Sequence, residues 1–333
     1  MYPKKPNISI ANISFADFIL NYLSYINVLS IYKSIRSLLI YRRTYRNYIN
    51  VMMNILKRKY PIEAIMRNGT HTMLHNLMEA QIHGGRHKSG GYNERIEYDT
   101  DNNIVRLSAL HFDHSTITIY GAITNGDIMN IFVNDIYHDL PVKDKTVIDI
   151  GANIADSALY FALRGATRII CLEPFPKNYE LAEKNIKLNN FSNTISLILA
   201  GCSNKREKIN IDPTYQSGIL SKLEDFRVGI DVPLLTLKDI LSDYNLPCDG
   251  SLILKMDCEG CEYETILSAD DNTLQEFSHM MIEYHYGYKN LKEKLERSGF
   301  RVSVTRPRIQ WSCSELFDKK FNLAVGNIFA ERI

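Results

Sequence analysis

The sequence lacks an apolar run long enough to cross a membrane. Its most apolar stretch, Phe15 to Ile40, is interrupted by serines and asparagines, whereas a membrane-spanning helix needs about 20 predominantly apolar residues. The first 20 residues also lack a compact apolar core followed by a small-residue cleavage site, so we expect no signal peptide. We therefore expect a cytoplasmic protein.

Cysteines are few and scattered. The chain has six among 333 residues, which does not fit the disulfide framework of a small secreted domain, and we expect mostly reduced thiols. Cys258 and Cys261 have the Cys-x-x-Cys spacing, but a structural zinc site normally needs four ligands and no second close pair is present. A thioredoxin-like redox pair does not suit this context either. We expect both to be small side chains that fill a packed turn.

Acidic residues are almost absent from the first 60 positions. Ten Lys or Arg residues stand there against Asp17 alone, a balance of +9, so the remainder of the chain carries −8 to give the net charge of +1. This polarity indicates that the amino-terminal part meets something acidic, which is a membrane surface, a nucleic acid or the rest of this protein.

The amino-terminal region is predicted to be helical. Polar residues from Asp17 to Ser37 recur every three or four positions, with apolar residues on the opposite side, which predicts an amphipathic helix. A second helix is predicted over about Tyr45 to Tyr60, because Pro61 cannot continue it without losing a hydrogen bond.

A glycine-rich stretch around residue 90 predicts a flexible connection. We therefore expect a basic, amphipathic helical region at residues 1–90 and a second domain at residues 91–333. The helical region either packs on the second domain or makes a peripheral membrane contact with anionic lipid through residues 15–60.

From Thr146 onwards the pattern alternates between strand and helix. Buried apolar strands separated by helices imply an α/β fold, with a mostly parallel sheet covered on both faces. The expected strands are Thr146–Ile150, Arg168–Glu173, Thr194–Ala200, Ser251–Asp257 and His279–Tyr284. The expected helices are Ile154–Arg164, Lys177–Asn189, Leu237–Tyr244, Cys261–Ser268 and Lys289–Ser298. An antiparallel hairpin after residue 299 is expected to close the sheet edge.

A β-hairpin entry segment is expected before this alternation. Its short β segments are Ile104–Leu107, Thr116–Tyr120 and Ile128–Val133, with a turn at Asn125-Gly126.

The first strand of the alternating region delivers a candidate nucleotide site. Open α/β sheets bind ligands beyond the carboxyl ends of their strands, where Asp149, Gly151 and Asn153 follow one another. Gly151 permits a sharp turn and a close approach, and the next helix points its amino end to the same place, where a carboxylate is favoured. Glu173, 22 residues after Gly151, has the spacing of an acid that accepts hydrogen bonds from ribose hydroxyls.

The number of glycines separates two cofactors. NAD sites usually need Gly-x-Gly-x-x-Gly, but Asn153 and Asp156 stand where the second and third glycines would lie. S-adenosylmethionine (SAM), whose methionine carboxylate suits the helix end, is therefore favoured over NAD.

A second constellation ends the fourth large strand. The segment Leu252 to Glu262 places three carboxylates, those of Asp257, Glu259 and Glu262, at the same edge of the sheet. Isolated acids usually mark the solvated start of a helix. Their position after a buried apolar run favours a functional role instead.

Four motifs, in order and at fitting distances, resemble the FkbM family of methyltransferases. They are Thr146-Val-Ile-Asp-Ile-Gly-Ala-Asn-Ile, Cys171-Leu-Glu-Pro-Phe-Pro, Leu254-Lys-Met-Asp-Cys-Glu-Gly-Cys-Glu and Ile282-Glu-Tyr-His. The resemblance covers residues 125 to 305 and implies a class I, Rossmann-like methyltransferase fold. It also implies SAM as cofactor and methylation of an oxygen on a small molecule, sugar or glycolipid.

The resemblance gives the site residues their roles. It implies SAM binding by Asp149, Gly151, Asn153 and Glu173, and we place Asp156 and Gly201 in the same cofactor-binding set. The sequence departs from the family at Ala155, where the family commonly has glycine. An extra methyl group at that position is expected to crowd the methionine end of SAM.

The catalytic residues follow from position alone. We expect Asp257 or Glu259 to orient the acceptor hydroxyl and take its proton, with His285 as a competing general base. No dedicated metal site is predicted, although Asp257 and Glu259 suit a divalent metal such as Mg²⁺ as an alternative aid.

Two other functions stay open. One is a catalytically silent SAM-fold module that docks to a membrane or a protein through the basic region, motivated by Ala155. The other, methylation of a nucleic acid, is disfavoured, because the chain has no Asn-Pro-Pro-Tyr type of motif and the basic segment is matched by an acidic remainder.

Overall fold

The computed structural model divides the chain into two compact units, one from Phe18 to Asn93 and one that contains Glu94 to Ile333. Each unit is described by itself. The structure describes residues 14, 38–67, 69, 71–74, 80, 95–99, 101–108, 115–215, 229–311 and 322–333. Residues 15–37 of the predicted amphipathic helix, and the predicted boundary near residue 90, lie outside these ranges.

The amino-terminal unit combines helix and hairpin. Helix α3 (Tyr48–Leu56) lies within the predicted helix, and strands β1 (Ile62–Ile65) and β2 (His71–Leu74) pair antiparallel after it. The expectation of an entirely helical region is therefore wrong. Residues of β1 alternate between buried and more exposed positions, the period of a strand, and the Asn47 side chain binds the backbone of β1 at Glu63 and Ile65. No helix in the described part of the chain is long and apolar enough to span a bilayer.

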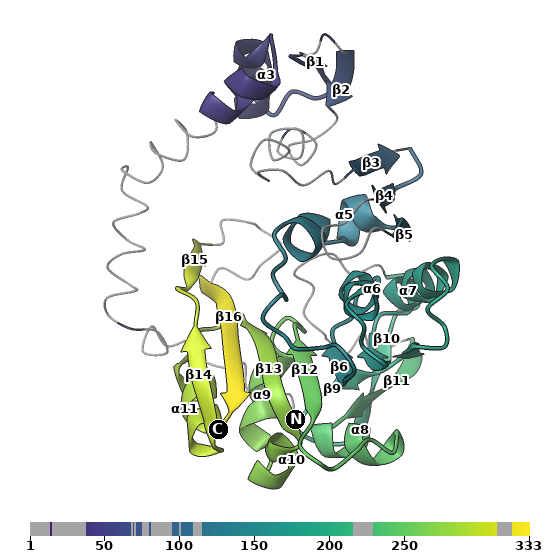
Figure 1. Ribbon diagram of the computed structural model, residues 1–333, viewed down its shortest axis with the longest axis vertical. Helices are drawn as coiled ribbons and strands as arrows, with labels where there is room; N and C mark the ends of the chain where they lie inside the picture. Colours follow the sequence, from purple (N-terminus) through teal and green to yellow (C-terminus); the bar gives the residue numbers. More distant parts are fainter. Residues whose placement is uncertain are drawn as a thin grey trace. The chain divides into compact units, whose positions relative to one another are not determined.

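The larger unit is built on an eight-stranded sheet (Figure 1). Its strands follow the order β14-β16-β13-β12-β6-β7-β8, and β15 pairs with β16. The strands are β6 (Thr146–Ile150), β7 (Arg168–Leu172), β8 (Ile195–Ile198), β12 (Leu252–Met256), β13 (Phe277–Tyr284), β14 (Phe300–Val304), β15 (Arg308–Trp311) and β16 (Asn322–Arg332). Strands β6, β7, β8, β12 and β13 run parallel, whereas β16 is antiparallel to β13 and β14. The predicted mostly parallel sheet with an antiparallel closing strand is confirmed.

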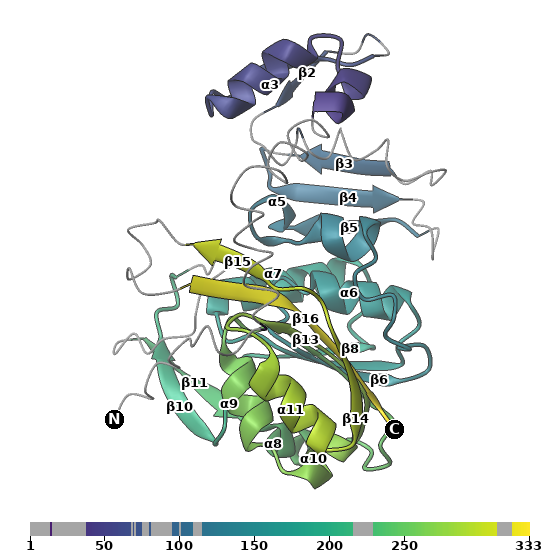
Figure 2. The same ribbon diagram turned by 90° about the vertical axis from the view of Figure 1, so that its left-hand side faces the viewer.

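Helices cover both faces of this sheet (Figure 2). Along β6, Val147 enters one core, while Ile148 and Ile150 enter the other, because successive side chains of a strand point to opposite faces. Helices α6 (Asp156–Leu163) and α7 (Pro176–Leu188) supply the first core. The second core is supplied by α8 (Leu237–Asp243), α9 (Cys261–Ser268), α10 (Asp271–Gln275) and α11 (Lys289–Arg297).

Two small sheets complete this unit. Strands β9 (Gly201–Cys202), β10 (Glu207–Ile211) and β11 (Ile230–Leu235) form one of them. The predicted entry segment forms the other, an antiparallel sheet of β3 (Arg95–Asp99), β4 (Ile104–Ser108) and β5 (Ile117–Tyr120).

The last predicted strand of the entry segment is wrong. Asn125 ends a short helix, α5 (Ala122–Asn125), and residues Met129–Val133 form the π-helix η2. Ile131 and Phe132 are its buried side chains, and Ile128, which immediately precedes it, is buried three and four positions before them, a helical spacing. The apolar run concealed this period.

Candidate active site

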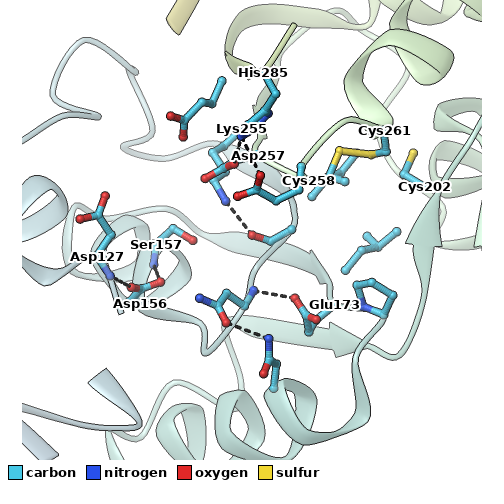
Figure 3. Close-up of a pocket in the computed structure, with 18 of the residues that line it drawn as sticks. Asp127, Asp156, Ser157, Glu173, Cys202, Lys255, Asp257, Cys258, Cys261 and His285 are labelled. Atoms are coloured by element: carbon cyan, nitrogen blue, oxygen red, sulfur yellow. Dashed lines mark hydrogen bonds and ion pairs between the residues drawn. A yellow bond between two sulfur atoms is a disulfide. The ribbon is translucent and has the colours of Figure 1, made fainter. Parts of the chain in front are cut away.

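A cavity of about 310 Å³ opens at the carboxyl ends of β6, β7, β12 and β13. The sheet order reverses direction at β6, which has β7 on one side and β12 on the other, and ligands of open α/β sheets bind at such a switch point. Figure 3 shows the lining, in which Glu173 and His285 belong to different walls. The cavity therefore joins the two constellations singled out in the sequence.

The turn after β6 requires glycine for two reasons. Gly151 has a φ of 78°, in the left-handed region that glycine adopts without strain. A Cβ atom there would also overlap the carbonyl oxygen of Asp257 in the turn that follows β12. The two turns are thus packed backbone to backbone, and Gly151 lines the cavity between them.

Glu173 lies at the end of β7 with its carboxylate buried at the cavity wall. Each oxygen accepts one backbone hydrogen bond, from N–H of Asn153 (2.8 Å) and from N–H of Phe175 (2.9 Å). Burial nevertheless raises the pKa of Glu173 to about 8. Because each carboxylate oxygen can accept more than one hydrogen bond, Glu173 keeps acceptor capacity for the hydroxyl groups of a ribose in the cavity.

Asn153 is fixed by its neighbours. Its side-chain oxygen accepts hydrogen bonds from the amides of Asn125 (2.8 Å) and Asn178 (3.0 Å), and its own amide donates to the Asn125 carbonyl. Its φ of 50° is left-handed, a conformation that asparagine tolerates better than most residues. This cluster of amides holds the floor of the cavity in place.

Asp149 is absent from the cavity lining. It is fully buried, lies 3.0 Å from Nζ of Lys255 and accepts a hydrogen bond from the Ser157 hydroxyl at 2.6 Å. Lys255 Nζ also donates to the carbonyl of Gly151 at 2.8 Å. Asp149 therefore acts on the glycine turn indirectly: it pairs with Lys255, whose ammonium group donates to the Gly151 carbonyl.

Asp156 occupies the amino end of α6 with its own carboxylate. The carboxylate accepts hydrogen bonds from the backbone N–H groups of Asp127 and Ser157, and burial raises its pKa to about 6. The amino end of α6, where the methionine carboxylate of SAM was expected to bind, is thus occupied by the carboxylate of Asp156. A carboxylate at this position suits the positively charged amino group of the methionine part of SAM instead.

Of the remaining two residues singled out in the sequence, Gly201 lines the cavity and Ala155 does not. Gly201, in β9, lines the cavity. Ala155 is fully buried in the core that contains α6, has a φ of 66°, and is absent from the lining. Its methyl group packs into the protein and does not narrow the cavity.

His285 is buried between carboxylates. Its Nδ1 lies 3.1 Å from Glu262, while its Nε2 lies 3.1 Å from Glu259 and 3.8 Å from Asp257. Burial by itself lowers the pKa of His285, but Glu262 and Glu259 outweigh it and raise the pKa well above its usual value. Both ring nitrogens of His285 thus face carboxylates, which stabilise the charged imidazolium and leave no ring nitrogen open to accept a proton from a substrate.

Glu283, on β13, lies beside Asp257. Burial and the neighbouring Asp257 charge raise the pKa of Glu283 to about 8, because two adjacent carboxylates are not both ionised without cost. Asp257 is about a third exposed and borders the cavity. Among the predicted proton acceptors, Asp257 is the carboxylate that His285 does not already engage closely.

One group of side chains in the described ranges has the spacing of metal ligands. Asp257, Glu283 and His285 each offer an atom within 4.8 Å of the others. The donor set does not fit a metal as it is arranged, because the Nε2 atom of His285 lies 3.1 Å from a Glu259 carboxylate oxygen and its Nδ1 atom lies 3.1 Å from Glu262.

The two cysteines of the Cys-x-x-Cys segment are joined. Cys258 and Cys261 form a disulfide, so the expectation of reduced thiols at this turn is wrong, and both residues border the cavity (Figure 3). The spacing alone did not distinguish a bonded pair from packed thiols. Cys171, Cys202 and Cys248 are free.

Among the cavity residues that the sequence did not predict are Lys255, Asp127 and Arg308. Lys255 could have been found, because a lysine inside the apolar strand β12 requires a buried partner. Asp127 and Arg308 also border the cavity but stand in segments with no readable pattern. They come from opposite ends of the larger unit and meet only through the fold.

Comparisons with known proteins identify a family and a relative for this chain. Residues 149–302 match the family model of the methyltransferase FkbM domain. The methyltransferase sdnD of Sordaria araneosa is 25% identical over 218 residues, which are 55% of this chain and 83% of that protein.

Similar solved structures have lower identity. A precorrin-6y C5,15-methyltransferase from Geobacter metallireducens is 16% identical, with a TM-score of 0.34 over 60% of this chain and 86% of that one. An rRNA methylase from Streptococcus thermophilus is 10% identical, with a TM-score of 0.35 over 61% and 96% of the two chains. The fold assignment rests on the strand order. With the predicted motifs and the family match in agreement, the chain carries a methyltransferase domain of the FkbM family at residues 149–302.

Proposed function

We propose that this chain transfers the methyl group of SAM to a hydroxyl oxygen of a small polar acceptor such as a sugar. The observation that supports this most is that Glu173 and Asn153 border the same cavity as Asp257 and Glu283. One part of its lining suits a nucleoside, and the other suits a hydroxyl group that has to lose a proton.

The residues that would hold SAM are those around the glycine turn. Glu173 would accept from the ribose hydroxyls, Asp156 would bind the amino group, and Leu172 and Phe175 offer apolar surface for the base. When bound, SAM supplies an electrophilic methyl group on a sulfonium, so the protein has mainly to align the acceptor.

Asp257 is our candidate for the general base. His285 and Glu259 lie 3.1 Å apart and are engaged with each other, so among the three predicted proton acceptors Asp257 is the one able to take the hydroxyl proton. Glu283, which is protonated at neutral pH, would orient Asp257 by donating to it.

Replacing Asp257 tests this role. We expect Asp257→Asn to lower kcat by about 100-fold or more, the range typical for loss of a general base, while the SAM dissociation constant stays within about twofold. Calorimetry with SAM and steady-state kinetics measure the two effects. Asp243→Asn, on the exposed end of α8, is the matched control and should leave both unchanged. Undiminished kcat in Asp257→Asn would remove Asp257 from the mechanism.

Metal removal tests the reading of His285. Both ring nitrogens of His285 are occupied by carboxylates at 3.1 Å, so we expect methyl transfer to proceed at the same rate after dialysis against EDTA. Activity lost to EDTA and restored by Mg²⁺ would mean that Asp257, Glu283 and His285 bind a metal during turnover.

The function itself is tested in two steps. Thermal-shift titration with SAM and S-adenosylhomocysteine should give saturable stabilisation, whereas no shift at millimolar ligand would favour the catalytically silent module. Incubation with labelled SAM and fractionated metabolite extracts, followed by mass spectrometry, should then reveal a product that has gained one methyl group on an oxygen. Label found only on nucleic acid would contradict the proposal.

A further inference from the structure

The disulfide encloses a residue of the site. Cys258 follows the end of β12 and Cys261 begins α9, so the bond closes a turn whose two inner residues are Glu259 and Gly260. Glu259 is the carboxylate that lies 3.1 Å from Nε2 of His285.

The backbone of this turn needs support. Glu259 has a φ of 57°, a left-handed conformation that costs a non-glycine residue roughly 1–3 kcal/mol and persists only where the surroundings hold it. Gly260 has a φ of 121°, and a Cβ there would be 3.0 Å from the ring of Tyr286. Two covalent or polar ties meet the turn: the disulfide, and the hydrogen bond from N–H of Cys258 to Glu262 (3.0 Å).

The same two ties fix His285. Glu262 accepts from Cys258 and also lies 3.1 Å from Nδ1 of the imidazole, while Glu259 is held at Nε2 by the closed turn. Opening the disulfide removes the covalent tie across the turn and leaves only the hydrogen bond from N–H of Cys258 to Glu262. Glu259 is then the carboxylate free to leave His285.

We propose that the Cys258–Cys261 disulfide is a redox-sensitive positioning element, which holds Glu259 against His285 and so keeps the acceptor side of the cavity competent for methyl transfer. The inference rests on the proposed function, because its effect on turnover presumes transfer in this cavity. Cys258 and Cys261 act through Glu259 and His285 and do not contact the reacting atoms.

The bond is open to a small dithiol. Both cysteines are only partly buried and border the cavity. In the reduction, a dithiol thiolate attacks one sulfur and the Cys258–Cys261 bond breaks. The second dithiol thiol then closes on the mixed disulfide, so the protein gains two electrons and two protons and the reagent leaves as a cyclic disulfide. Burial raises the pKa of Cys202 to about 12, so this third cavity thiol does not compete as a nucleophile at neutral pH.

Dithiothreitol titration of the whole protein tests the inference. Alkylation and peptide mass spectrometry first establish that Cys258 and Cys261 are bonded in the oxidised protein and free after reduction. We expect kcat to fall by about tenfold on reduction. A misplacement of about 1 Å costs about a hundredfold in rate, and we expect Glu259 and His285 to shift by less than that. The SAM dissociation constant should change by less than about twofold. Reoxidation should restore kcat.

A second readout separates positioning from general loss of structure. The His285 imidazole, followed by NMR, should titrate at lower pH in the reduced protein, because one of its carboxylates has moved away. The double variant Cys258→Ser/Cys261→Ser should reproduce the reduced state and no longer respond to dithiothreitol. Cys248→Ser, a free and exposed cysteine, is the control that should keep the full response.

The outcomes divide cleanly. Equal kcat and an equal His285 titration in the oxidised and reduced proteins would overturn the inference, as would free thiols in the protein oxidised by air or glutathione disulfide. Absence of methyl transfer in both states, with the His285 shift present, would overturn the proposed function and leave the positioning by the disulfide standing. Should the double variant not fold, the dithiothreitol titration of the natural protein decides alone.

Discussion

Glu173 shapes the fold and, in the proposed function, also binds the ribose of SAM. Its two oxygens accept the N–H groups of Asn153 and Phe175, which shapes the turn after β6 and the start of α7. The same carboxylate borders the cavity, where burial without a ligand raises its pKa to about 8. Its charge is therefore stabilised most when hydroxyl groups donate to it.

Replacement of Glu173 by glutamine should weaken SAM binding. The glutamine amide would place its own N–H group against one of the two backbone donors, N–H of Asn153 or of Phe175, and would lose an acceptor for the ribose hydroxyls. We expect SAM binding to weaken by about 1.5–3 kcal/mol, or roughly 10- to 100-fold in the dissociation constant. Isothermal calorimetry measures the loss. Glu180→Gln, an exposed glutamate paired with Lys177 in α7, should bind SAM normally. Equal affinities in the two variants would exclude Glu173 from the ribose site.

At this scale the sequence predicted position better than chemical state. Gly151, Asn153, Glu173 and Asp257 were placed at one sheet edge by strand ends, and all four border the cavity. The charge of His285 was not predictable, because it depends on carboxylates that only the folded chain brings to both ring nitrogens.

Partners that are distant in sequence limited the reasoning in the same way. Asp149 was assigned to the cofactor by its place in a motif, but Lys255, more than 100 positions later, draws it into a buried ion pair behind the turn.

The contact between the turns after β6 and β12 is the element on which the site depends most. We expect Gly151→Ala to destabilise the domain by about 3 kcal/mol or more, because left-handed strain is joined by overlap with the Asp257 carbonyl. Gly165→Ala is the matched control: its φ is also positive, 86°, but a Cβ would meet only the Lys143 side chain and backbone at 3.4 Å and beyond. It should cost about 1 kcal/mol. Equal losses in urea denaturation would mean that the contact between the turns has no energetic weight.

Elements were predictable where burial imposes a clear period. The central strands are short apolar runs between helices, and their order along the chain foretold the sheet. The π-helix η2 and the β1–β2 hairpin were missed because each segment is too short for its period to be separated from an apolar run or from a neighbouring helix. Side-chain ties such as Asn47 to Ile65, which fix the hairpin, carry no sequence signature.

For the whole molecule, the buried ionisable groups predict an uncommon pH dependence of stability. Glu173 and Asp156 have folded pKa values of about 8 and about 6, above their values of 4.5 and 3.8 in the unfolded chain. Between those values the folded state holds protons that the unfolded state has released, so stability falls as pH rises. His285 acts in the same direction: its contribution is complete below pH 6.5 and is lost as pH approaches its raised folded pKa.

We therefore expect the free energy of unfolding to fall by on the order of 5 kcal/mol between pH 5 and pH 8 in the absence of SAM, because Glu173 contributes about 3 pKa units and Asp156 about 1 unit over this interval, each unit being about 1.4 kcal/mol. Urea denaturation at several pH values measures the slope. Glu173→Gln, which removes one of the titrating groups, should flatten it. A stability that rises over this interval would show that these carboxyl groups are ionised in the folded protein.

The backbone contact between Gly151 and Asp257 links the proposed SAM side of the cavity to the proposed acceptor side. Because no side chain lies between the two turns, a shift of one is transmitted to the other as a rigid displacement. A ligand that fixes the position of the first turn therefore also fixes the position of the second, and the coupling between the two binding events is reciprocal. Donor and acceptor should bind cooperatively, each lowering the dissociation constant of the other by the same factor.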